Sequence, residues 1–401
     1  MNKASPVAVE VPGSVCVDCA KDPSLKRFVL MRGRIGPRCC LCQRTNLIAS
    51  TPETYEALAS LVCALIRFYY NEWDYNHHWG GERSPELLLK RSNPIFEHEP
   101  PHGLTRDPNE SEDFLSGLFD LSWPDYDEGI CIYRGFHEGM RLPPLTAISN
   151  SESPTLANAI ARLRNENYFE VQPELESYLS DLGSAIQVIV KSGETFYRAR
   201  LGHEERFIAD VTFDPEILFQ PYLGRQIGAP SPPYAKAGRA NREGVSFLYL
   251  STDAKTASAE VRPHPGHVIS IGAFCAKQDL RIADFGAIDI GDFAGSDARL
   301  DLFHLSYSID RALGLPVTPE EHSRYTATQL VADIMRHRGY DGIRFKSSVA
   351  EGANLCAFRP DLFSEIQDLA KVLRVTGLHY TTEELPCVIQ PTAEHITIDR
   401  T

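Results

Sequence analysis

The stretch AGRANREGVSFLYLS, residues 237–251, decides the fold of the C-terminal half of the chain. Its second part, Val245–Leu250, is a β-rich run that predicts a short strand. Ser251 ends this strand and can cap a short helix over Thr252–Val261. Further strands are expected at His267–Phe274, Leu280–Asp284, Gly342–Phe345 and Asn354–Phe358. One longer helix is expected from Thr318 to about His337. Short strands that alternate with helices predict an α/β domain.

The polar side chains around this stretch are candidates for a functional site. Arg239 lies in a Gly-flanked turn before the strand, and Tyr249 lies near the strand's end. Glu260 falls in the last turn of the short helix, where a carboxylate opposes the helix macrodipole. From its position alone, Glu260 is either a surface residue paired with Arg262 or a residue with a buried or ligand-binding role. The chain has no G-x-G-x-x-G after a strand and no G-x4-GK[ST], so a bound nucleotide must be held by another arrangement.

Five short motifs, in order and at sensible spacings, resemble the RES domain over about residues 190–365. They are FYRAR at 196–200, the stretch at 237–251, AxAEVRP at 257–263, DGIRFKSS at 341–348 and NLCAF at 354–358. The Arg, Glu and Ser that give the family its name correspond here to Arg239, Glu260 and Ser347, and Ser348 is a close rival for the third.

This resemblance implies an ADP-ribosyltransferase-like α/β fold and an activity on NAD. RES proteins are bacterial toxins that cleave the bond between nicotinamide and ribose by phosphorolysis or hydrolysis, and an antitoxin holds many of them inactive. The resemblance therefore implies an NAD glycohydrolase or NAD phosphorylase that depletes cellular NAD, with an antitoxin as possible partner. Two alternatives stay open. One is an ADP-ribosyltransferase that modifies a macromolecule, and the other is a catalytically dead zinc-dependent adaptor or nucleic-acid sensor.

The chemistry of that reaction gives the matched residues expected roles. Cleavage of an N-glycosidic bond passes through an oxocarbenium-like ribose, which a positioned carboxylate can stabilise. Planar guanidinium groups suit the two charges of the NAD diphosphate. The resemblance implies catalytic roles for Arg239, Glu260, Tyr249 and Ser347. It implies NAD-binding roles for Arg198, Arg200, Asn241, Ser348 and Asn354. A core Tyr and a turn Asn remain the alternative interpretations of Tyr249 and Asn354.

The N-terminal cysteines have the spacing of a metal site. Cys16, Cys19, Cys39 and Cys42 form two C-x2-C pairs separated by nineteen residues, an arrangement typical of zinc binding. Cys40 offers a third thiol in the second pair, but the two-residue gap favours Cys39 and Cys42. A site closed by four sulfurs has no position for water, so the zinc is expected to be structural. Gly33 and Gly36–Pro37 between the pairs favour a short ribbon hairpin, and free cysteines remain the alternative.

Charge and periodicity divide the rest of the chain. Residues 1–50 hold eight Lys and Arg against three Asp and Glu, whereas residues 51–190 hold nine against 23. Apolar residues from Leu58 to Tyr69 recur at helical spacing after the start signal Thr51–Pro52. Together with the zinc head, this acidic helical region resembles the HEPN-like module of some RES proteins. The HEPN ribonuclease motif would need Arg91 and His98 on one helix, and Pro94 between them argues against it.

These observations define a multidomain α+β protein with three parts. We expect a zinc-knuckle head at residues 1–50, an all-α, HEPN-like module at 51–190 and a RES domain with a C-terminal tail at 191–401. The formal net charge of −14 repels nucleic acid, so such contact is expected only through the basic head. The sequence predicts no signal peptide and no membrane span, which points to the cytoplasm, and it allows a homo-oligomer.

Overall fold

The structure is a computed structural model that describes residues 13–75, 80–81, 85–89, 95–97, 108–122, 144–209, 216–315 and 325–379, together with residues 382, 384 and 387. Its α-helices are α1 (Pro23–Arg32), α2 (Tyr55–Tyr69), α3 (Glu72–Tyr75), α4 (Pro108–Ser122), α5 (Pro154–Leu163), α6 (Tyr168–Asp181), α7 (Ala254–Glu260), α8 (Asp297–Gly314) and α9 (Tyr325–His337). Its strands are β1 (Arg34–Ile35), β2 (Ile48–Ala49), β3 (Gln187–Val190), β4 (Thr195–Leu201), β5 (Arg206–Ile208), β6 (Ile217–Phe219), β7 (Leu248–Ser251), β8 (Val268–Ala276), β9 (Leu280–Asp284), β10 (Gly342–Lys346), β11 (Ala353–Ala357), β12 (Phe363–Glu365) and β13 (Lys371–Arg374).

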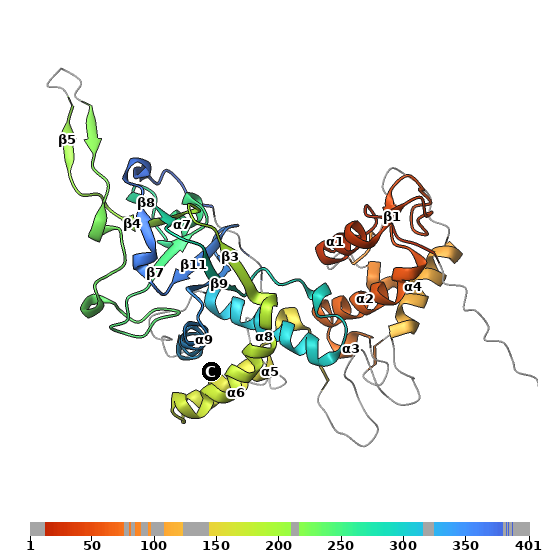
Figure 1. The fold of residues 1–401 in the computed structure, drawn as a ribbon. Helices are drawn as coiled ribbons and strands as arrows, with labels where there is room; N and C mark the ends of the chain where they lie inside the picture. The colour runs from red at the N-terminus through yellow and green to blue at the C-terminus, as the bar shows by residue number, and fades with distance from the viewer. Residues whose placement is uncertain are drawn as a thin grey trace, which may run out of the picture.

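One large mixed sheet organises the C-terminal half (Figure 1). Its strand order is β12-β8-β4-β7-β11-β10-β9-β3, and β13 also pairs with β8. Most neighbours are antiparallel, whereas β9 and β10 run parallel. β4 pairs with β8 along its whole length but with β7 only at Tyr197 and Ser251. The sheet therefore opens between β4 and β7, and the space between them is where the cavity described below lies.

Helices cover this sheet and continue into the N-terminal part. α7 packs against β4, β7 and β8, whereas α8 and α9 pack against β10. The predicted strands in this half are confirmed, β7 starting later than expected. Asp253, not Ser251, caps α7: its side chain accepts a hydrogen bond from the backbone N–H of Thr256. The prediction of Ser251 as the cap was wrong because Ser251 is still in the strand, with its hydroxyl turned to a buried partner on β11.

The N-terminal head contains a helix that the sequence analysis missed. α1 fills most of the spacer between the two cysteine pairs, where a ribbon hairpin was predicted. Asp22 caps α1 by accepting from the N–H groups of Ser24 and Leu25, and Pro23 stands at its first turn. The two-residue strands β1 and β2 do pair, but β2 lies beyond the second cysteine pair.

Contacts among the described residues cross both predicted domain limits. β3 lies before residue 191 yet forms an edge of the large sheet, paired with β9. α5 contacts α8 and α9, and α6 contacts α9. A single cluster of buried apolar side chains runs from the head through these helices to β10. The division at residues 50 and 190 therefore stays a prediction. The Arg91–His98 pair and the Thr318 helix start lie outside the described residues.

Candidate active site

A cavity of about 430 Å³ opens where β4 and β7 separate. This volume lies within the range of small-molecule sites. The predicted site residues that line it are Arg198, Arg239, Tyr249, Glu260 and Asn354. They come from β4, the turn before β7, β7 itself, the end of α7, and β11. The sheet thus gathers side chains that are up to 156 positions apart in the sequence.

Arg198 occupies the opening between the two strands. Its Nη1 donates to the Tyr249 carbonyl oxygen at 2.7 Å, on the strand with which β4 no longer pairs. Its Nε is buried without a hydrogen-bond partner. Burial lowers the pKa of the Arg198 guanidinium to about 10, and the nearby Arg200 charge adds to this. A buried cation with an unused donor is costly unless an anion meets it, so Arg198 favours an anionic ligand.

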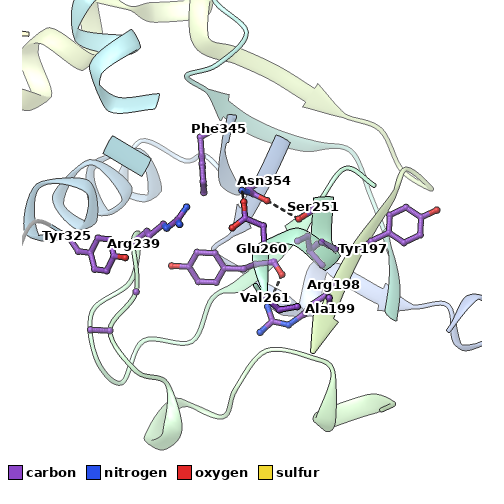
Figure 2. A pocket seen from close by; sticks show the side chains of 15 residues that line it. Tyr197, Arg198, Ala199, Arg239, Ser251, Glu260, Val261, Tyr325, Phe345 and Asn354 are labelled. Carbon is purple, nitrogen blue, oxygen red and sulfur yellow. Dashed lines mark hydrogen bonds between the residues drawn. The ribbon is translucent and has the colours of Figure 1, made fainter. Parts of the chain in front are cut away.

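Glu260 is the only carboxylate among the described residues that line the cavity. Its Oε1 accepts hydrogen bonds from Ser347 Oγ at 2.7 Å and from Asn354 Nδ2 at 2.6 Å. Ser251 Oγ in turn donates to Asn354 Oδ1 at 2.9 Å, which fixes the orientation of that amide. Figure 2 shows this series of side chains on one side of the cavity. Within the described part of the chain, no hydrogen bond reaches Glu260 Oε2, and no ion pair joins Glu260 to Arg262.

Tyr249 on β7 is hydrogen-bonded to the Gly-flanked turn that contains Arg239. Its hydroxyl donates to Asn241 Oδ1 at 2.7 Å and accepts from the N–H of Ala240 at 3.1 Å. Burial raises the pKa of the Tyr249 hydroxyl well above its ordinary value near 10.0, so it stays a donor. A Cβ at Gly238 would lie 2.6 Å from Asn241 Oδ1 and 3.0 Å from the Tyr249 hydroxyl oxygen. The close approach of these groups therefore requires glycine at position 238.

The Arg239 side chain points from this turn toward the cavity (Figure 2). Its Nη1 donates to the Leu313 carbonyl oxygen at 2.9 Å, in the last turn of α8, where a cation complements the helix macrodipole. In Figure 2 the Arg239 side chain lies across the cavity from Glu260, beside Tyr325 and Phe345. The two charged groups to which the resemblance gave catalytic roles thus face one cavity from opposite sides (Figure 2).

Four predicted residues do not line the cavity. Asn241 is buried and uses its amide to bind three backbone carbonyls of the turn. Arg200 donates to the Gly228 carbonyl oxygen, and Ser348 donates to the Gly314 carbonyl oxygen. Ser347, which is also not a lining residue, contacts Glu260 directly and Ser348 does not. Geometry therefore favours Ser347 as the functional serine of the pair.

Among the lining residues that were not predicted as site residues are Ser251, Tyr325 and Phe345. Ser251 was interpreted as a helix cap, and Tyr325 and Phe345 carried no recognised signal. Ser251 lies opposite Asn354 in the β7–β11 pairing, which only the tertiary fold reveals. The two aromatic side chains are largely buried and give the cavity an apolar wall. Such a wall suits a flat ring more than a charged group.

The four N-terminal cysteines converge on one point. Their sulfurs all lie within 4.8 Å of one another, and every one of these side chains is fully buried. Cys16 Sγ and Cys42 Sγ are 3.6 Å apart, close to the edge of about 3.8 Å of a tetrahedron with 2.3 Å zinc–sulfur bonds. Cys40 is not in the set, and its sulfur accepts from the N–H of Ser14. The donor set fits a metal ion closed by thiolates.

The comparison with known families supports the resemblance to the RES domain. Residues 214–379 match the family described as RES domain. No curated protein matches the chain. A solved structure that matches is the crystal structure of the M. tuberculosis MbcT-MbcA toxin-antitoxin complex, at 13% identity over 50% of this chain and 92% of that chain, with a TM-score of 0.28. A TM-score this low supports no argument about fold or function.

The family match assigns a RES domain to residues 214–379 of the chain. The matched range includes Arg239, Tyr249, Glu260, Ser347 and Asn354, whereas β4 with Arg198 lies before it. None of the helices among the described residues has both the length and the apolar character that a membrane span needs.

Proposed function

We propose that this protein is an NAD-consuming enzyme that cleaves the bond between nicotinamide and ribose. The observation that carries the proposal is the position of Glu260. Two donors hold its Oε1, and the carboxylate lines the same cavity as the Arg239 and Arg198 guanidinium groups. One negative and two positive groups around one cavity match the charges of a dinucleotide whose ribose becomes cationic in the transition state.

Each part of the cavity has a role in this proposal. The Glu260 carboxylate stabilises the developing charge on the ribose or directs the incoming nucleophile, because Ser347 and Asn354 keep it in one orientation. Arg198 and Arg239, which both line the cavity, bind the diphosphate through their guanidinium groups. The apolar wall of Tyr325 and Phe345 receives the nicotinamide ring.

The acceptor of the ADP-ribose group separates the possible activities. Phosphate, water and a protein side chain differ only in what enters on the Glu260 side of the cavity. Purified protein should be incubated with NAD in the presence and absence of inorganic phosphate, and the products should be identified by mass. ADP-ribose 1″-phosphate indicates phosphorolysis, free ADP-ribose indicates hydrolysis, and added mass on protein indicates ADP-ribosyl transfer. If intact NAD is recovered under all conditions, the proposal is wrong.

The proposed cellular role is a toxin that depletes NAD, restrained by an antitoxin. This follows from the RES domain, and the cytoplasmic location and the partner remain predictions. The alternative function of a nucleic-acid sensor has less support from the basic head, residues 1–50. Three of its arginines make ion pairs with carboxylates: Arg27 with Asp289, Arg38 with Glu110 and Arg44 with Asp18. These arginines balance nearby acids, which leaves less positive charge for phosphate.

The cluster of four N-terminal cysteines is proposed to bind a structural zinc ion. A zinc ion bound there would cross-link the two cysteine pairs of the head and would take no part in a reaction in the cavity. Arg44 lies beside this cluster, where the Cys42 thiolate and Asp18 raise the pKa of its guanidinium. Its Nη2 donates to Asp18 at 2.6 Å, so one charged pair is packed against the sulfurs.

A further inference from the structure

Helix α8 runs from the N-terminal helices to the large sheet (Figure 1). Its last turn contacts Arg239, which lines the cavity. In the first half and at the middle of α8, Phe303 and Tyr307 pack against Phe68 of α2, with ring centroids 6.1 and 5.3 Å from the Phe68 ring. Just before α8, the short 3-10 helix Ile290–Asp292 contacts both α1 and α2. The helix is therefore held at this end by the head and by the helical region.

At its other end, α8 contacts both sides of the candidate active site. The Leu313 carbonyl oxygen accepts from Arg239 Nη1 at 2.9 Å. The Gly314 carbonyl oxygen accepts from Ser348 Oγ at 2.6 Å. The last carbonyls of a helix have no partner inside the helix, so both contacts satisfy groups that would otherwise need water. The end of α8 thus fixes the Arg239 side and the Ser347–Ser348 side together.

A buried acid one turn earlier makes a third contact of this kind. Asp310 is 6% exposed, and its Oδ1 accepts from the backbone N–H of Lys346 at 2.8 Å. Lys346 ends β10 and immediately precedes Ser347, whose hydroxyl donates to Glu260. The packing leaves little room for movement, because a Cβ at Gly286 would lie 2.9 Å from Asp310 Oδ1.

We propose that Asp310 is a positioning residue for the active site, an inference that rests on the proposed function. It holds the backbone of Lys346, which places the Ser347 hydroxyl, which in turn orients the Glu260 carboxylate. Asp310 does not line the cavity and has no contact with a substrate held there. Its effect passes through two hydrogen bonds that are present in the absence of substrate. The Asp310 carboxylate on α8 and the Glu260 carboxylate on α7 are thus connected through Lys346 and Ser347.

The test compares Asp310→Ala with Asp310→Asn and with Ser308→Ala. Asp310→Asn keeps an oxygen that can accept from the Lys346 N–H. Ser308→Ala is the matched control, because Ser308 Oγ on the same helix also accepts a buried backbone N–H, that of Ser153, away from the cavity. We expect kcat for nicotinamide release to fall roughly ten- to a hundred-fold in Asp310→Ala, since small displacements of a catalytic group have effects of this size. KM should stay within about three-fold of wild type, because the substrate contacts remain.

A second readout needs no substrate. Amide hydrogen exchange of the segment 342–352 should quicken in Asp310→Ala and stay at the wild-type rate in Asp310→Asn and Ser308→Ala. Equal kcat in the Asp310→Ala and Ser308→Ala variants, equal loss in Asp310→Asn and Asp310→Ala, or unchanged exchange in Asp310→Ala would each overturn the proposal. If wild-type protein releases no nicotinamide, the proposed function fails, and the exchange comparison still decides the positioning role.

Discussion

Replacement of Asn354 by alanine tests how the active-site carboxylate is held. In the wild-type protein, Asn354 Nδ2 donates to Glu260 Oε1 at 2.6 Å, and the Asn354 side chain is 6% exposed. A hydrogen bond to a charged group is worth about 1.5–3 kcal/mol. If that free energy is what keeps the carboxylate in its working orientation, its loss lowers kcat by about ten- to a hundred-fold, since 1.4 kcal/mol corresponds to about a factor of ten.

A smaller effect is expected one step further from the cavity. Ser251→Ala removes the donor that orients the Asn354 amide, a neutral hydrogen bond of 2.9 Å. Neutral bonds contribute about 0.5–1.5 kcal/mol, so kcat should fall about two- to ten-fold. We therefore expect a lower kcat for Asn354→Ala than for Ser251→Ala. Asn354 contacts Glu260 directly, whereas Ser251 acts on Glu260 only through Asn354.

The assay is steady-state release of nicotinamide from NAD, with kcat and KM determined separately and thermal unfolding measured for each variant. Ser258→Ala is the control, because Ser258 lies on α7 two residues before Glu260, and among the described residues its hydroxyl bonds only to the Ala254 carbonyl oxygen. We expect this control to retain wild-type kcat. Should Asn354→Ala also stay within about two-fold of wild type, the idea that this amide holds Glu260 is refuted.

Three further predictions concern stability and metal content. Gly238→Ala should lower the free energy of unfolding by about 1–3 kcal/mol in denaturant titrations, because the new Cβ would overlap Asn241 Oδ1; an unchanged midpoint contradicts the tight turn. Elemental analysis should find about one zinc per chain, and Cys16→Ser should lose that zinc and melt at lower temperature, whereas full zinc content in the variant would exclude Cys16 as a ligand. Burial lowers the pKa of His304 to about 4, so the unfolded state binds the extra proton and stability falls as the pH drops from about 6.5 to about 4. This loss, up to about 3 kcal/mol by denaturant unfolding, should be absent in His304→Asn, and an equal loss in the variant would contradict the assignment.

The sequence predicted the parts of the site that depend on motif order. Arg239, Glu260 and Asn354 come from three separate motifs, and the fold brings all of them to one cavity. Local signals also predicted five strands of the large sheet, β7 to β11, and the helix α7. These signals are local, because a strand pattern, a helix cap and a turn glycine can each be recognised within a few residues of sequence.

What the sequence did not reveal depends on long-range pairing. Ser251 carried a local signal for a cap, but the β7–β11 register places it opposite Asn354, 103 positions away. α1 did carry a start signal in Asp22–Pro23, but the prediction for the spacer considered only its glycines and Pro37. The role of α8 had no local signal, because carbonyl oxygens at a helix end are the same in every sequence.

The most direct measurement of the central claim is the release of nicotinamide from NAD by wild-type protein and by Glu260→Gln and Arg239→Ala. Each variant removes one of the two opposite charges that face the cavity, and Glu260→Gln keeps the shape of the side chain. The account predicts rapid release by wild type and at least a hundred-fold lower kcat/KM in both variants, on the order expected when a transition-state charge loses its partner. Release at the wild-type rate by either variant, with unfolding temperatures unchanged, contradicts it.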